Sequence, residues 1–234
     1  MRLRLISVVC ALGATCASAA DFSLGALSQD DLRGLTRDLG AAMSYKGVTP
    51  GTALGPIGFD IGVEATDTKL ESSSAFARAG VGDRSHLVIP KLHVYKGLPA
   101  GFDIGAFVGG TTEVNATLVG LDLRYAIIDD TLTSPALAAR ISGTRMTGTG
   151  DLKLSTGAFD VMVSKRFTLL TPYVGAGAVR VQSQARGTAL AEEKFSRGRV
   201  FGGLNVNLVG ANLAIEAEKM GDNTSLSAKV GIRF

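Results

Sequence analysis

Apolar and polar residues alternate with a period of two from Ile57 to the end of the chain. Alternation of this kind predicts β-strands that each carry one apolar face. Ten strands are expected, at residues 57–70, 86–95, 101–110, 114–127, 136–146, 152–167, 172–184, 198–209, 212–219 and 225–234. Short connections alternate with longer or more polar ones along the chain, which predicts neighbouring antiparallel hairpins.

One phrase occurs twice in this region, as PIGFDIG at 56–62 and as PAGFDIG at 99–105. A glycine-rich phosphate loop should follow a strand and open a helix. Here the glycines occupy alternate positions inside a predicted strand, so the repeat is interpreted as the start of a strand. Its proline precedes the ladder, its phenylalanine faces outward and its aspartate faces inward.

The two faces of the predicted strands differ in polarity. The face proposed as outer is apolar, with Val119, Leu121 and Leu123 as examples. The inner face collects seven acids and eight bases as a charge network lining a lumen: Asp60, Glu64, Lys91, Asp103, Asp122, Arg124, Arg140, Asp160, Arg166, Arg180, Arg199, Glu216, Glu218, Lys229 and Arg233. A soluble barrel around an apolar ligand would have the reverse polarity. The pattern therefore predicts an all-β fold: a closed antiparallel transmembrane β-barrel of about ten strands.

Two details qualify the predicted wall. Pro90 interrupts the second strand and cannot donate to a closed ladder, so a bulge is expected there. The outward aromatic residues are all expected at the periplasmic end: Phe59, Phe102, Tyr125, Phe167, Tyr173 and Phe234.

A short amphipathic helix is predicted ahead of the strands. Ser28 is its candidate N-cap with Asp31 at the capping-box position, and Leu32, Leu35 and Leu39 recur at helical spacing. Two roles are open: a cap packed against the barrel end, which the sequence favours, or a plug in the lumen. With an even number of strands, both ends of the barrel and the helix should lie on the periplasmic side.

The first 20 residues combine an early pair of arginines, an apolar stretch and small residues before Asp21, which is typical of a cleaved signal peptide. Both cysteines lie within this segment, so no disulfide or Cys-based metal site is expected in the exported chain. Its removal leaves 22 basic residues against 21 acidic ones. A nearly neutral chain argues against nucleic-acid binding.

The final residues read LSAKVGIRF, with Val230, Ile232 and Phe234 on one face. An alternating last strand that ends in phenylalanine resembles the assembly signal of small Gram-negative outer-membrane β-barrel proteins of the broad OmpA- and OmpW-like kind. The resemblance implies an outer-membrane location, contact with its lipid and insertion by the barrel-assembly machinery. It divides the chain into a signal peptide (1–20), a periplasmic helix with its linker (21–56) and the barrel (57–234).

Catalytic chemistry has little support in the sequence. His86 and His93 are the two histidines, and strand alternation points the neighbouring Ser85 and His86 to opposite faces. Asp60 with Glu64, and Glu216 with Glu218, are acid pairs that suit salt bridges better than a metal. No cofactor and no enzymatic activity are expected.

The expected function is therefore that of a structural barrel, or of a narrow or gated channel for a small solute that the sequence does not identify. Two alternatives stay open: surface binding through the loops at 71–85 and 185–198, and an outer-membrane hydrolase.

Overall fold

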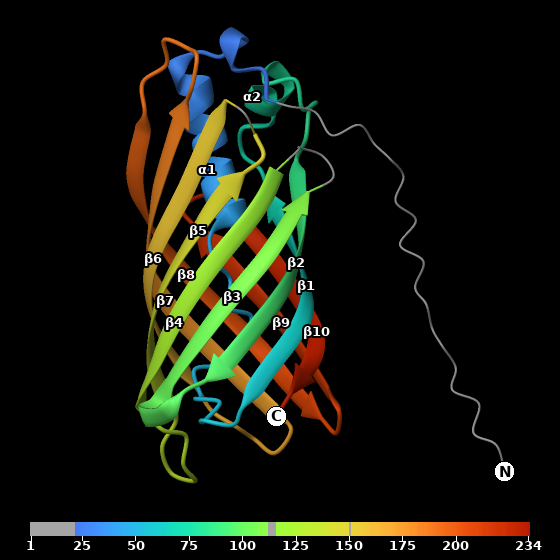
Figure 1. The fold of residues 1–234 in the computed structure, drawn as a ribbon, viewed down its shortest axis with the longest axis vertical. Helices are drawn as coiled ribbons and strands as arrows, with labels where there is room; N and C mark the ends of the chain where they lie inside the picture. The colour runs from blue at the N-terminus through green and yellow to red at the C-terminus, as the bar shows by residue number, and fades with distance from the viewer. Residues whose placement is uncertain (1–21, 112–115, 150) are drawn as a thin grey trace, which may run out of the picture.

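The computed structural model describes residues 22–111, 116–149 and 151–234, and the predicted signal peptide lies outside this part of the chain. Ten antiparallel strands close into one barrel (Figure 1). They are β1 (Phe59–Lys69), β2 (His86–Gly97), β3 (Phe102–Thr111), β4 (Ala116–Ile128), β5 (Ala136–Thr147), β6 (Leu152–Ser164), β7 (Leu170–Ala185), β8 (Glu193–Leu208), β9 (Ala211–Met220) and β10 (Asn223–Arg233). The helices are η1 (Leu24–Ala26), α1 (Gln29–Met43), α2 (Ser73–Arg78) and η2 (Pro99–Gly101). The predicted fold class is confirmed.

The barrel closes between its first and last strands. β1 pairs with β10 from Asp60↔Arg233 to Thr68↔Ser225. Beyond the last register pair, the Phe59 N–H donates to the Phe234 carbonyl at 2.7 Å and the Phe234 N–H donates back at 3.0 Å. A closed ladder leaves no edge strand whose backbone groups lack partners, which is the requirement for a sheet in lipid.

The outward positions form an apolar surface. Val63 is 57% exposed and Leu121 is 66% exposed, although both side chains are aliphatic. Aromatic pairs mark the end of the barrel that holds the C-terminus, with ring centroids 5.9 Å apart for Phe59 and Phe234. Tyr173 is the exception among the predicted outward aromatics, because it points into the lumen and is 5% exposed. No helix in the described ranges is long and apolar enough to span a membrane.

The bulge expected at Pro90 is wrong. The β1–β2 register runs without a shift through Ala65↔Pro90. The β2–β3 register begins one residue later, at Lys91↔Gly109, so the missing proline N–H falls where that pairing has ended. The ladder is irregular elsewhere, between Ala126 and Ile128 on β4.

The position expected for the helix is also wrong. Figure 1 shows α1 inside the barrel, in the half that carries α2, and the C-terminus at the opposite end. We call these the loop end, which holds the long β1–β2 connection (70–85), and the C-terminal end. The helix lies inside because the inner wall of the barrel near the loop end is apolar. Its apolar residues are Leu87, Ile89, Leu118, Met146, Val179 and Val181. Leu32, Leu35 and Leu39 bury the apolar face of α1 against this wall, and each is at most 3% exposed.

Small residues let the helix fit. At the deep end of α1 an added Cβ at Gly40 would lie 2.8 Å from the Val181 methyl groups, so only glycine suits that contact. Ala41 and Ala42 follow it and are fully buried. Beyond Ser44 the chain continues through the lumen as an irregular strap, residues 44–58, and reaches the start of β1 at the C-terminal end. We call α1 and the strap together the lumenal segment.

Candidate functional site

The lumen around the strap is lined by paired charges. Seven acids and six bases point inward from the strands in its central and C-terminal parts: Asp60, Glu64, Asp103, Asp122, Asp160, Glu216 and Glu218, with Lys91, Arg124, Arg140, Arg199, Lys229 and Arg233. Lys91 Nζ lies 2.8 Å from Glu64 Oε1, and Lys229 Nζ lies 3.0 Å from Asp60 Oδ2. Burial of this many charges is tolerated because nearly every one has an opposite charge within contact distance.

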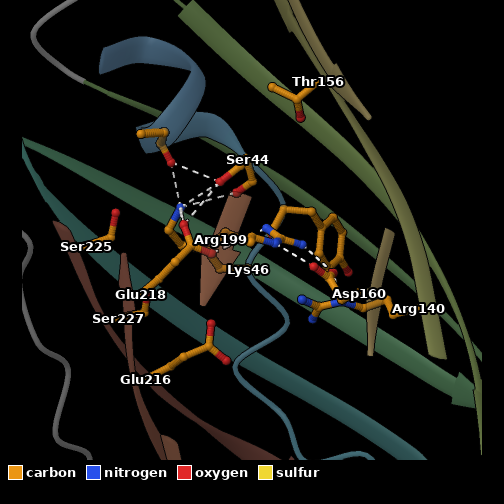
Figure 2. Close-up of polar contacts among 12 residues, drawn as sticks. Ser44, Lys46, Arg140, Thr156, Asp160, Arg199, Glu216, Glu218, Ser225 and Ser227 are labelled. Atoms are coloured by element: carbon orange, nitrogen blue, oxygen red, sulfur yellow. Dashed lines mark hydrogen bonds and ion pairs between the residues drawn. The ribbon is translucent and has the colours of Figure 1, made fainter. Parts of the chain in front are cut away.

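Asp160 on β6 is the centre of this network (Figure 2). Arg140 on β5 donates from Nε to Asp160 Oδ2 at 3.0 Å, and Arg199 on β8 donates from Nε to Oδ1 at 2.6 Å. Arg199 also donates from Nη2 to Asp160 Oδ2, which completes a two-point contact. One carboxylate therefore holds two fully buried guanidinium groups from strands that are not neighbours.

The lumenal segment adds one charge of its own to the network. Lys46 is fully buried, and its Nζ lies 3.1 Å from Glu218 Oε1 on β9. The same ammonium donates to the Ala41 carbonyl at 2.7 Å and to Ser44 Oγ at 3.0 Å (Figure 2). With Lys46 included, seven formal positive charges meet the seven acids of the lumen wall. Lys46 thus balances the formal charge of the central and C-terminal parts of the lumen.

Side chains of the wall also form hydrogen bonds with the backbone of the strap. The strap has no helix or strand to pair these backbone groups. Arg199 Nη1 donates to the Tyr45 carbonyl at 2.8 Å, and Arg124 Nη1 donates to the Pro50 carbonyl at 2.5 Å. In the other direction the Leu54 N–H donates to Asp103 Oδ1 at 3.0 Å. Charge-assisted bonds from three wall residues therefore hold the strap along its length.

A tight aromatic layer surrounds the start of the strap. The Tyr45 ring lies 5.2 Å from the Phe107 ring and 5.8 Å from the His93 ring, centroid to centroid. An added Cβ at Gly47 would lie 2.2 Å from Arg140 Nη1, so the wall closes directly on the strap backbone. The strap is enclosed at this level, with Tyr45 and Lys46 both at 0% exposure.

Hydrogen bonds fix α1 near the loop end. Thr36 Oγ1 and Ser183 Oγ on β7 lie 2.6 Å apart. Asn223 Nδ2 on β10 donates to Asp38 Oδ1 at 2.7 Å, and Asp38 Oδ2 accepts from the Ser72 N–H, also at 2.7 Å. These partners come from two strands and the β1–β2 connection, so the helix is tied to opposite parts of the barrel mouth.

An ion pair between Asp31, in the first turn of α1, and Arg78 of α2 should weaken at low pH. Arg78 donates to both carboxylate oxygens of Asp31, and this bond, followed by one from the Ser28 N–H, lowers the pKa of Asp31 from 3.8 to about 2. A depressed carboxyl pKa stabilises the folded state above pH 3.8 and loses that contribution as the pH falls towards 2. Arg78 is exposed and the pair lies at the protein surface, so the effect on overall stability is small.

We expect the Asp31 carboxyl to titrate near pH 2 in the folded protein and at a higher pH in Arg78→Gln, where the hydrogen bond from the Ser28 N–H remains. Nuclear magnetic resonance of the carboxyl carbon in micelles measures both midpoints. Equal midpoints in the two proteins would show that Arg78 does not hold the carboxylate.

Two residues predicted for the lumen are elsewhere. Arg180 on β7 points to the outer surface, because the inward positions of β7 are Val179 and Val181. Arg166 lies in the connection between β6 and β7, where it is exposed and 3.8 Å from Asp130. The prediction extended the β6 strand three residues too far and placed the alternation of β7 one residue out of phase. The other predicted lumenal residues lie inside the barrel.

The sequence interpretation missed the residues of the strap, which it treated as a linker. Tyr45, Lys46 and Gly47 lie outside any periodic pattern, and only their contacts in the barrel give them a role. It also missed Tyr173, whose hydroxyl donates to Glu216 Oε2 at 2.9 Å.

Each of the two histidines contacts a carboxylate. His86 is exposed at the start of β2, with Nδ1 3.0 Å from Asp67 Oδ2. His93 is buried, with Nε2 2.7 Å from Glu64 Oε2. Within the described ranges no group of three His, Cys, Asp or Glu residues could hold a metal ion.

These features define a class of protein: a closed antiparallel β-barrel with an apolar exterior and a charged lumen, which is the architecture of small outer-membrane β-barrels. The chain matches no protein-family model. It also matches no curated protein in sequence.

Solved structures similar to the chain are barrels of this class. Ail, the attachment invasion locus protein of Yersinia pestis, is 15% identical over 76% of this chain and 97% of its own, with a TM-score of 0.35. The KdgM porin is 10% identical over 75% of this chain and 99% of its own, with a TM-score of 0.38. The translocator domain of the autotransporter NalP from Neisseria meningitidis is 14% identical over 88% and 96%, with a TM-score of 0.41.

Proposed function

We propose that this protein is a non-enzymatic barrel of the Gram-negative outer membrane whose own lumenal segment closes a conduit for small ions and solutes. The observation that carries the proposal is the complete burial of Lys46 against Glu218 in the middle of the lumen. A barrel that serves only as a wall could fill its lumen with side chains from its own strands, as eight-stranded barrels do. Here a separate, continuous piece of chain occupies that space.

Two features of the geometry support a plug that leaves as a unit. It precedes β1 in the chain and contributes no strand to the barrel, so its departure breaks none of the strand pairings. The bore at the level of α1 is wide enough for a helix, whose diameter with side chains is about 10 Å. The strap is held by polar contacts, which water can replace when it leaves.

The lumen left behind would be charged. Without Lys46, the acids of the wall exceed its lysines and arginines by one formal charge. The proposal therefore expects a narrow conduit with a weak preference for cations. Its regulation would depend on whatever displaces the lumenal segment.

Planar-bilayer conductance tests the proposal. The mature protein should be silent, and a variant that lacks residues 21–58 should show discrete, weakly cation-selective steps. Folding of both is checked by the shift in gel mobility that heating produces in folded barrels. Silence of a folded deletion variant would show that the wall alone seals the lumen, and the proposal would then fail.

A further inference from the structure

The outer surface of the barrel changes from apolar to polar at one level near the loop end. On β6 the outward residues run from Phe159 through Gly157 and Ser155 to Lys153, and on β7 they run from Val174 through two alanines to Arg180. On β5 the outward residues run from Ile141 through Gly143 to Arg145. Three neighbouring strands therefore each place a cation just above the apolar belt.

Two of these cations, Arg145 and Lys153, line a groove on the outer surface. It has a volume of about 230 Å³, and its other polar lining residues are Ser155, Gln182, Ser183, Gln184 and Glu192. The strand registers hold the group together: Arg145 is opposite Ser155, and Ser155 is opposite Gln182. Arg180 follows on the same face of β7, two residues from Gln182.

The three cations lack protein counter-charges. Across the described ranges Arg145, Lys153 and Arg180 form no ion pair, whereas Glu192 is occupied by Lys194 at 2.7 Å. Two other outward charges near the loop end have partners: Asp67 lies 3.0 Å from His86, and Lys69 lies 3.0 Å from Glu71. A cluster of unpaired arginine and lysine beside an apolar belt attracts anionic groups, and arginine binds phosphate through two parallel bonds.

We infer that this rim of β5, β6 and β7 binds the phosphorylated head group of a lipid in the leaflet at the loop end. The phosphates would lie on Arg145, Lys153 and Arg180. Gln182 and Gln184 would meet sugar or glycerol hydroxyls, and the acyl chains would cover Ile141 and Phe159 below. The inference uses the membrane placement of the proposed function, but it does not depend on the lumenal segment.

Lipid titration of the folded full-length protein in zwitterionic micelles tests this site by native mass spectrometry. The probe is a diphosphorylated, acylated glucosamine disaccharide, compared with the same lipid without its phosphates and with inorganic phosphate alone. The variant R145Q/K153Q/R180Q is compared with R37Q/K69Q/K219Q, which removes the same charge from exposed positions elsewhere.

The diphosphorylated lipid should bind at least tenfold more weakly to the rim variant than to the wild type, and the control variant should keep the wild-type affinity. All three side chains are exposed or half-buried, so the rim variant is expected to fold. Equal loss in both variants would indicate general charge attraction and overturn the site. Equal binding of the dephosphorylated lipid, or equally tight binding of inorganic phosphate, would also overturn it. Conductance plays no part in this readout, so failure here leaves the proposed plug untouched.

Discussion

Replacing Lys46 by glutamate should release the lumenal segment from the barrel. The substitution puts a carboxylate beside Glu218 where a 3.1 Å ion pair stood, in a site with 0% exposure for Lys46. Breaking a buried ion pair costs about 3–5 kcal/mol because the remaining charge stays desolvated. The equilibrium for departure of the segment should therefore shift by a factor of roughly 10² to 4 × 10³, at about 1.4 kcal/mol for each tenfold.

Single-channel recording measures this effect, with discrete steps in Lys46→Glu and none in the wild type. Arg37→Glu is the matched control, since it makes the same charge change on an exposed face of α1. Lys46→Met should fall between them, because Glu218 keeps its contact with Arg199 at 3.3 Å. A silent and folded Lys46→Glu would contradict the role given to this lysine.

The second large effect is expected at Asp160. Asp160→Asn leaves Arg140 and Arg199 without their shared carboxylate, and both guanidinium groups stay buried. Their other acids are less well placed, with Arg140 Nε 3.6 Å from Asp122 and Arg199 Nη1 3.3 Å from Glu218. We expect a loss of about 3–5 kcal/mol in the free energy of unfolding of the barrel.

Urea unfolding in micelles, followed by the heat-sensitive gel mobility of the folded barrel, measures that loss. Asp67→Asn is the control, because Asp67 and His86 form an exposed pair on the outer surface, for which a change below about 1 kcal/mol is expected. If the two variants were equally stable, Asp160 would not be the centre of the network.

The barrel itself could be predicted from the sequence because strand burial has a strict period of two. The alternation around the Gly-Phe-Asp-Ile-Gly repeats placed Asp60 and Asp103 in the lumen, and both are fully buried. The same rule failed for Arg180, where the outward run of β7 changes from alanine to arginine at the edge of the apolar belt. Beyond the apolar belt, outward residues are polar because they face the membrane surface. A cation at such a position therefore cannot be told from a lumenal one by its polarity.

The lumenal segment could not be predicted in the same way. The strap has no period, and the contacts of Lys46 with Glu218 and of Thr36 with Ser183 join residues far apart in the chain. The apolar inner wall at Leu87 and Val181 was hidden for a related reason. Beside Leu87 the outward Val88 is also apolar, and beside Val181 the outward Arg180 is polar, so polarity near the loop end no longer tells the inner face from the outer one. The helix and its capping box were local features, and they were predicted correctly.

The most direct test of the account is a disulfide between α1 and the barrel wall. Thr36→Cys and Ser183→Cys replace two buried hydroxyl groups whose oxygen atoms lie 2.6 Å apart, and the native cysteines are confined to residues 1–20. Complete disulfide formation is expected in the membrane-inserted protein. In the Lys46→Glu background, conductance should be absent in the oxidised protein and appear on reduction. Failure of the bridge to form, or steps of equal size in both redox states, would show that the lumenal segment does not close this barrel.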